Sequence, residues 1–151
     1  MKRTRIILYI IILFLLNHLL VEAQKAPMKW GKVEAADLQM SSYLPDSQAN
    51  AVVLCDYATY SFDFGTDENL YRVSRHRRIK ILTRAGFDEG NVIIPYYKRG
   101  GSGLTVKAQV VQPDGSKVEI AKREMFDEQV YESRYNKRIA FPDLLEGSII
   151  E

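Results

Sequence analysis

Cys55 and His76 are the residues whose types could support nucleophilic chemistry, because residues 24–151 contain one cysteine and one histidine. A thiol beside an imidazole can act as a nucleophile and its base when both lie in one cleft. Cys55 ends the apolar run 51–55, where a buried small hydrophobic residue is the commoner role. The sequence therefore argues against a catalytic dyad, and a structural zinc would lack ligands.

Other short patterns that resemble reactive or binding sites are weak. Residues 99–103 are rich in glycine but lack the spacing and the Lys-Ser/Thr ending of a phosphate-binding loop, so a hairpin tip is favoured. The carboxylate pairs at 67–68 and 88–89 fall in predicted turns, without the further oxygen ligands that calcium needs. We expect no catalytic residues, no metal site and no cofactor in this chain.

A recognition surface is the remaining possibility, and two basic and aromatic clusters could form it. The candidates are Arg75, His76, Arg77, Arg78, Tyr96 and Tyr97. Aromatic rings beside charged groups are typical of surfaces that bind peptides or glycans. The alternative is structural: a solvated basic strand face and the half-buried rim of a sandwich.

A long strand over residues 70–82 must position the basic cluster, since it contains no glycine or proline. With a period of two, one face carries Ile79 and Ile81, and the other is basic and predicted to be solvated. Arg75 and Arg77 fall on the mainly apolar face. We expect a bulge, a bend or carboxylate partners there.

Short strands and tight turns dominate the rest of the chain. Pro113-Asp114-Gly115 predicts the turn of a hairpin over residues 104–120, and Pro95 places its strand at an edge or a bulge. One short amphipathic helix without a capping residue is predicted over residues 33–40, and residues 121–137 are predicted to be irregular. Further strands are predicted over residues 51–55, 57–64, 92–97, 138–141 and 148–151. The pattern predicts a mainly β protein, an antiparallel β-sandwich with one short N-terminal helix.

Residues 1–23 have the pattern of a signal peptide, with a basic start, an apolar run over 6–16 and predicted cleavage after Ala23. Retention as an N-terminal anchor is the alternative. Cleavage would remove Lys2, Arg3, Arg5 and Glu22, which leaves 18 basic and 18 acidic residues. A chain so balanced gives no electrostatic reason to expect a nucleic-acid partner. We predict export to the periplasm or cell envelope, a leader over 24–29 and one domain over 30–151.

An ordered series of short segments resembles a family of bacterial domains of unknown function. The segments are Trp30-Gly31-Lys32-Val33, Asp37-Leu38, residues 49–54, 75–82 and 92–97, Pro113-Asp114-Gly115, Phe141-Pro142 and residues 146–151. Members of that family lie just before a transglutaminase-like domain in exported proteins. The resemblance implies a sandwich with an immunoglobulin-like look, no catalytic residues of its own, and a partner domain of the papain-like Cys-His-Asp type.

Three functions remain open. The first is a non-catalytic exported module that packs against a transglutaminase-like domain or binds a peptide or glycan ligand for it. The second is a fragment of a transglutaminase-like hydrolase or protease. The third is an envelope-anchored interaction protein, with membrane contact only if residues 1–23 are retained. The family pattern continues beyond residues 147–151 into another strand, so we expect a domain that is incomplete at Glu151.

Overall fold

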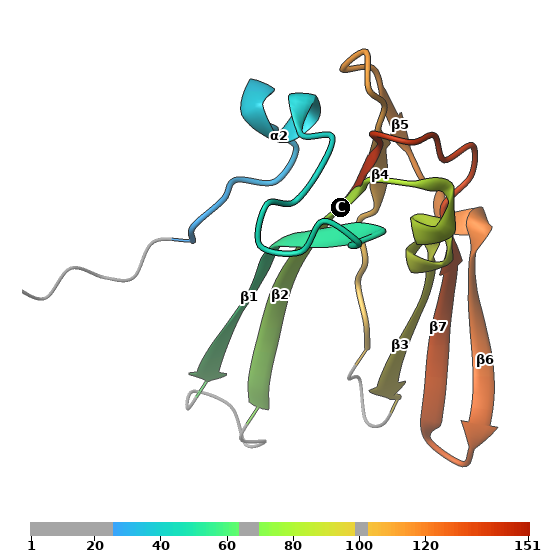
Figure 1. The fold of residues 1–151 in the computed structure, drawn as a ribbon. Coiled ribbons are helices and arrows are strands. Elements are labelled where there is room, and N and C mark those ends of the chain that lie inside the picture. Colours follow the sequence, from blue (N-terminus) through green and yellow to red (C-terminus); the bar gives the residue numbers. More distant parts are fainter. Residues whose placement is uncertain (1–25, 64–69, 99–102) are drawn as a thin grey trace, which may run out of the picture.

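The computed structural model describes residues 26–63, 70–98 and 103–151, and it consists of two antiparallel sheets in a sandwich-like arrangement (Figure 1). The larger sheet has the strand order β1-β2-β8-β4-β5, and the smaller has the order β3-β7-β6. The strands of the larger sheet are β1 (Ala51–Asp63), β2 (Leu70–Ile81), β8 (Ile149–Ile150), β4 (Gln109–Val111) and β5 (Lys117–Glu119). Those of the smaller sheet are β3 (Asn91–Tyr97), β7 (Arg134–Ala140) and β6 (Met125–Tyr131). The predicted mainly β class is confirmed.

Helical structure is short in the described residues. The predicted N-terminal helix is α2 (Ala35–Gln39), and Glu34 before it makes no side-chain cap. Two 3₁₀ helices, η1 (Arg84–Gly90) and η2 (Lys122–Glu124), connect strands. No helix in the described ranges is long and apolar enough to cross a membrane. The predicted signal peptide and the loops at 64–69 and 99–102 lie outside the described residues.

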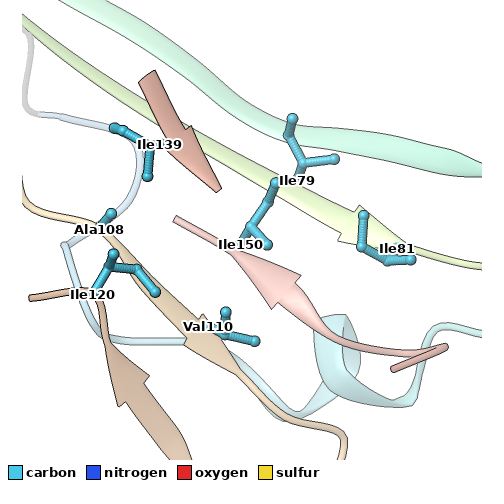
Figure 2. Packing of buried hydrophobic residues seen from close by; sticks show 7 residues of the cluster. All are labelled: Ile79, Ile81, Ala108, Val110, Ile120, Ile139 and Ile150. Atoms are coloured by element: carbon cyan, nitrogen blue, oxygen red, sulfur yellow. The ribbon is translucent and has the colours of Figure 1, made fainter. Parts of the chain in front are cut away.

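The core lies between the two sheets, and β2 supplies its centre (Figure 2). Ile79 and Ile81 point to the same side of β2, as the period of two predicts, and both are buried. They cluster with one residue of the smaller sheet and with residues around β4, β5 and β8: Ile139, Ala108, Val110, Ile120 and Ile150. Each isoleucine removed from water contributes about 1.5–3 kcal/mol, so this cluster holds the two sheets together.

Several strand predictions are confirmed with adjusted bounds. The runs predicted at 51–55 and 57–64 form one strand, β1, with a bulge between Val53 and Cys55. Pro95 lies in β3, an edge strand, as expected of a residue without an N–H. The hairpin turn at Gly115, with φ of 85°, joins β4 to β5. Its first strand begins at Gln109, later than the predicted position 104.

The prediction of irregular structure over residues 121–137 is wrong. This stretch contains η2, β6 and the first part of β7, and β6 pairs antiparallel with β7. Only Met125 of β6 is partly buried, and the residues after it are exposed. The ladder to β7 therefore holds β6 without burial of alternate side chains, and the sequence shows no apolar alternation.

Candidate functional site

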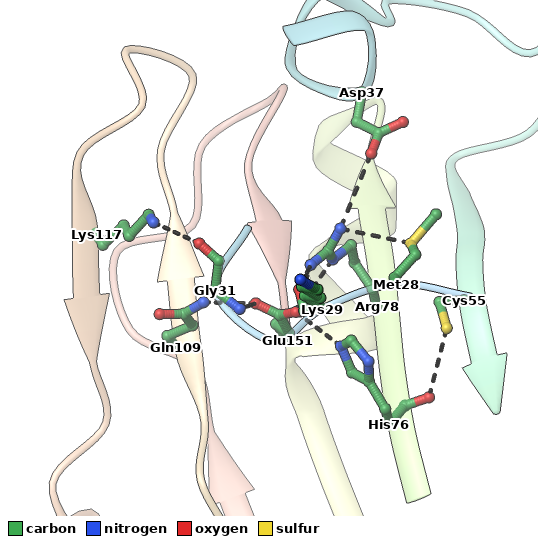
Figure 3. A network of polar contacts seen from close by, with 10 residues as sticks. All are labelled: Met28, Lys29, Gly31, Asp37, Cys55, His76, Arg78, Gln109, Lys117 and Glu151. Atoms are coloured by element: carbon green, nitrogen blue, oxygen red, sulfur yellow. Dashed lines mark hydrogen bonds and ion pairs between the residues drawn. The ribbon is translucent and has the colours of Figure 1, made fainter. Parts of the chain in front are cut away.

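The carboxylate of Glu151 is the centre of a buried polar network on the outer face of the larger sheet, the face turned away from the smaller sheet (Figure 3). Its side chain is 0% exposed. Oε1 accepts hydrogen bonds from Arg78 Nη2 at 2.5 Å and His76 Nε2 at 2.7 Å. Oε2 accepts from the backbone N–H of Gly31 at 3.0 Å and from the Gln109 side-chain amide. We call Glu151, Arg78, His76, Gln109 and Gly31 the Glu151 network.

Arg78 connects this network to the N-terminal segment, residues 26–50. Its guanidinium donates to the carbonyl oxygen of Lys29 at 3.0 Å and contacts Met28 Sδ at 3.4 Å. Asp37 of α2 lies 4.0 Å from Nη1, and its Oδ2 has no hydrogen-bond partner among the described residues. Because Arg78 reaches both Glu151 and the N-terminal segment, it fastens that segment across the sheet.

Lys80, two residues further along β2, also binds the N-terminal segment. Its ammonium donates to the carbonyl oxygens of Leu38 at 2.8 Å and Gly147 at 2.7 Å. Desolvation lowers the pKa of Lys80, and the nearby charge of Asp37 offsets part of that effect. Lys80 is 0% exposed and Arg78 is 1% exposed. The prediction that this face of β2 is solvated is therefore wrong at Arg78 and Lys80, because the N-terminal segment covers both side chains.

Glu151 is held as a carboxylate despite its burial. Desolvation alone would raise its pKa. Hydrogen bonds from Arg78, Gln109, Gly31 and His76 act in the opposite direction, and the net effect lowers the pKa of Glu151. A carboxylate stabilised in this way is a weak base, so Glu151 is suited to holding its hydrogen-bond donors in place rather than to abstracting a proton.

Cys55 and His76 are close, but the thiol does not face the imidazole. Cys55 Sγ lies 3.8 Å from the backbone carbonyl oxygen of His76. The imidazole turns instead to Glu151, and its ring lies 5.9 Å from the Trp30 ring, centroid to centroid. Burial raises the pKa of Cys55, which favours the unreactive thiol. Cys55 is 6% exposed, and its predicted burial is confirmed.

The six residues of the predicted recognition surface do not form one surface. His76 and Arg78 lie in the Glu151 network, whereas Arg75 and Arg77 occupy the other face of β2 and remain exposed. Arg75 bonds to Asp56 at 2.5–2.6 Å, and Arg77 lies within 4.0 Å of carboxylates of Asp56 and Glu89. The predicted carboxylate partners are thus confirmed.

The two tyrosines lie in the smaller sheet, on β3, and they occupy opposite faces of it. Tyr96 points to the same side as Val92 and Ile94, and its ring lies 5.8 Å from the Tyr135 ring. Tyr97 is 65% exposed. Because β2 and β3 belong to different sheets, the basic and aromatic clusters do not meet as one site.

Sequence reasoning missed Glu151, Gln109 and the backbone of residues 28–31 as parts of the network. The predicted strand at 148–151 carried one signal, since Glu151 alternates with Ile150 and takes the outer face. The leader predicted at 24–29 gave no such signal, yet Met28 and Lys29 contact Arg78. Contacts more than 40 residues apart in sequence have no local pattern.

No group of three or more His, Cys, Asp or Glu side chains that could hold a metal ion occurs in the part of the chain that the structure describes. The chain matches no protein-family model, no curated protein and no solved structure. The fold and the site together define a mainly β protein whose N-terminal segment is held on the larger sheet by hydrogen bonds to the buried charged side chains of Arg78, Lys80 and Glu151.

Proposed function

We propose that this chain is a non-catalytic, exported β-sandwich module that packs against a transglutaminase-like domain. The ordered sequence resemblance motivates the choice of companion. The Glu151 network supports the absence of catalysis, because its carboxylate and its arginine are already engaged within the chain. The Cys55 thiol, with its raised pKa, adds no nucleophile to it.

The observation that carries the packing role is the composition of the outer face of the smaller sheet. Ile93 of β3 and Phe126 of β6 both pair with Arg138 of β7, so two apolar side chains flank an arginine. Ile93 is 49% exposed and Phe126 is 65% exposed. We call the face formed by Ile93, Tyr97, Phe126, Arg134 and Arg138 the outer patch. Aromatic, aliphatic and arginine side chains together are typical of the centre of protein interfaces.

The gene sequence tests the choice of companion first. We expect an open reading frame, fused to this one or next to it, that encodes Cys, His and Asp in papain-like order. Reading the genomic DNA on both sides of the codons for this chain decides the point. A neighbourhood without such a frame would remove the companion from the proposal.

Binding by substituted modules then tests the outer patch. Ile93→Ser should weaken association with the purified companion domain by roughly tenfold or more, because a central apolar contact is lost. Val118→Ser is the matched control, since Val118 is 45% exposed but lies on β5 of the other sheet. Isothermal titration calorimetry gives both affinities. Equal binding by the two variants would exclude the outer patch as the docking face.

A further inference from the structure

A small cavity lies between the smaller sheet and the extended segment that leads into β4. Its volume is about 160 Å³, and it is lined by Leu104, Thr105, Val106, Lys122, Met125 and Lys137. Three of these side chains are apolar, and two carry a positive charge. Neither the Glu151 network nor the outer patch contains any of them, so the cavity is a separate feature of the fold.

The hydrogen bonds around β4 show on which side of this segment the cavity lies. On one side, β4 pairs with β8. On the other side, the carbonyl oxygen of Ala108 accepts from the N–H of Ile120 at 2.9 Å. The chain continues from Ile120 into η2 and β6, which supply Lys122 and Met125 to the cavity. The cavity therefore lies on the side away from β8, and β8 forms none of its walls.

Lys137 is an unusual residue for its position on β7. It lies two positions from the core residue Ile139 and pairs with Ile94 of β3, so its side chain leaves the inner face of the smaller sheet. That side chain is 15% exposed. Inner faces of sandwiches supply the core, and a charge there is unfavourable unless it is paired. A lysine at this position therefore requires partners for its ammonium.

Asp127 is one such partner, and it holds the lysine at the cavity. Asp127 lies opposite Lys137 in the β6–β7 ladder, and its Oδ1 is 2.5 Å from Lys137 Nζ. Hydrogen bonds from Lys137 and, less strongly, from Tyr96 hold the pKa of Asp127 below its ordinary value. An ammonium has three N–H donors, so Lys137 keeps donors for an acceptor inside the cavity that it lines.

Lys122 brings a second ammonium to the cavity from η2. The N–H of Ala121 donates to Glu124 Oε2 at 2.9 Å, and the N–H of Glu124 donates to the carbonyl oxygen of Ala121 at 2.8 Å, which fixes this turn. Among the described residues, no carboxylate forms an ion pair with Lys122. The lining of the cavity thus carries two positive charges, of which Asp127 balances one.

We propose that this cavity binds a small organic acid, with a single carboxylate on a compact apolar body. The carboxylate accepts charge-assisted hydrogen bonds from Lys122 and Lys137 and balances the remaining positive charge. The apolar body packs on Leu104, Val106 and Met125, the last two of which also pack against the core. An apolar cavity of about 150 Å³ accommodates benzene, so the body is of about that size.

This binding site is independent of the proposed packing role. The outer patch lies on the outer face of the smaller sheet, whereas Met125 and Lys137 point from its inner face into the cavity. A failed companion test therefore leaves the binding site in place, and a failed ligand test leaves the outer patch in place.

Titration of the full chain, after natural processing, with isocaproate tests the proposal. Two-dimensional amide NMR spectra report the binding, and we expect saturable shifts at Val106, Lys122, Met125 and Lys137 but none at Ala58 of β1. Isocaproamide has the same shape without the charge, and inorganic phosphate has charge without an apolar body. Each should bind at least about tenfold more weakly than the acid. Equal binding of acid and amide, or no saturable shift with the acid, would overturn the proposal.

Two lysine variants separate the cavity from general attraction of anions. Lys122→Met removes one ammonium at an exposed position, and it should weaken isocaproate binding about two- to fivefold, as expected for an exposed charge pair. Binding of the amide should not change. Lys107→Met is the matched control, because Lys107 is exposed on the same extended segment but does not line the cavity. It should bind the acid as the native chain does. Native affinity in Lys122→Met, or an equal loss in both variants, would contradict the proposal.

Discussion

The two halves of β2 carry the same kinds of residues and give them opposite environments. Arg78 is 1% exposed and lies under the N-terminal segment, whereas the side chain of Arg75, three residues earlier, is 60% exposed. Arg78 bonds to the carboxylate of Glu151, and Arg75 bonds to that of Asp56. The difference comes from the elements around them: β8 and the N-terminal segment enclose the first pair, and β1 alone supports the second (Figures 1 and 3).

This contrast shows that the contribution of an ion pair to stability depends on its surroundings as much as on the distance between the two charged groups. Two charges taken out of water lose hydration worth several kcal/mol each, so removal of one partner leaves the other uncompensated. An exposed pair is solvated in either state and contributes about 0–1 kcal/mol. Breaking the Arg78–Glu151 pair should therefore cost much more stability than breaking the Arg75–Asp56 pair, although the two pairs have similar distances.

Glu151→Gln should give the largest effect. The substitution removes the charge opposite buried Arg78, and we expect a loss of about 3–5 kcal/mol in the free energy of unfolding. Urea denaturation at pH 7 measures it. The double variant Arg78→Met/Glu151→Gln removes both charges and should recover part of the loss. A double variant no more stable than the single one would show that packing, rather than the uncompensated charge, dominates.

The pH dependence of the same variant sharpens the comparison. The folded state lowers the pKa of Glu151 from its ordinary value of 4.5, so its carboxylate stabilises the fold above that pH. That contribution is lost as the pH falls from about 4.5 through the lower, folded pKa. The difference in stability between native chain and Glu151→Gln should therefore shrink in this window. A constant difference down to the acid transition would contradict the lowered pKa.

Lys80→Met should give the next largest effect. Methionine fills a similar volume but leaves the carbonyls of Leu38 and Gly147 without their donor, a loss of about 1–3 kcal/mol. Lys117→Met is the control, since Lys117 also donates to a backbone carbonyl, that of Gly31, but at an exposed position. A Lys80→Met protein as stable as the native chain would mean that desolvation of the ammonium outweighs its hydrogen bonds.

Local patterns predicted those parts of the fold whose cause is local. The period of two placed Ile79 and Ile81 in the core, and Pro113 to Gly115 predicted the β4–β5 turn. Local patterns could not predict that the N-terminal segment covers Arg78 and Lys80, because these contacts join residues 42–49 positions apart. The same pattern that was correct for Ile79 was thus misleading for its basic neighbours.

The candidate site was less predictable than the fold for the same reason. For Arg75 on the mainly apolar face the sequence predicted a bulge, a bend or carboxylate partners, and Asp56 is such a partner across the β1–β2 ladder. His76 and Arg78 were predicted as parts of a recognition surface on a solvated strand face, whereas both bond to Glu151, which lies more than 70 positions away. Composition alone cannot show which carboxylate an arginine meets, since that is a property of strand order.

Cys55→Ala tests the boundary between the two halves of β2, because Cys55 pairs with Arg78 across the ladder. A small buried side chain is lost, and we expect about 1 kcal/mol of destabilisation. The native thiol should react with a thiol reagent far more slowly than in urea, since it is buried and its pKa is raised. Fast labelling in the native state would show that the enclosed half of the sheet opens readily there.

Asp56→Asn should give the smallest effect, and it is the matched counterpart of Glu151→Gln. Hydrogen bonds from Arg75 lower the pKa of Asp56, but the side chain is 36% exposed and that of Arg75 is 60% exposed. Water solvates both groups when the pair is broken, so the loss should be about 0.2–1 kcal/mol. It should become smaller still in 1 M salt, where the Debye length falls to about 3 Å and exposed charges are screened more strongly. Urea denaturation of both variants in low and high salt gives the comparison directly. If Asp56→Asn costs as much as Glu151→Gln, enclosure by β8 and the N-terminal segment cannot be what separates the two pairs.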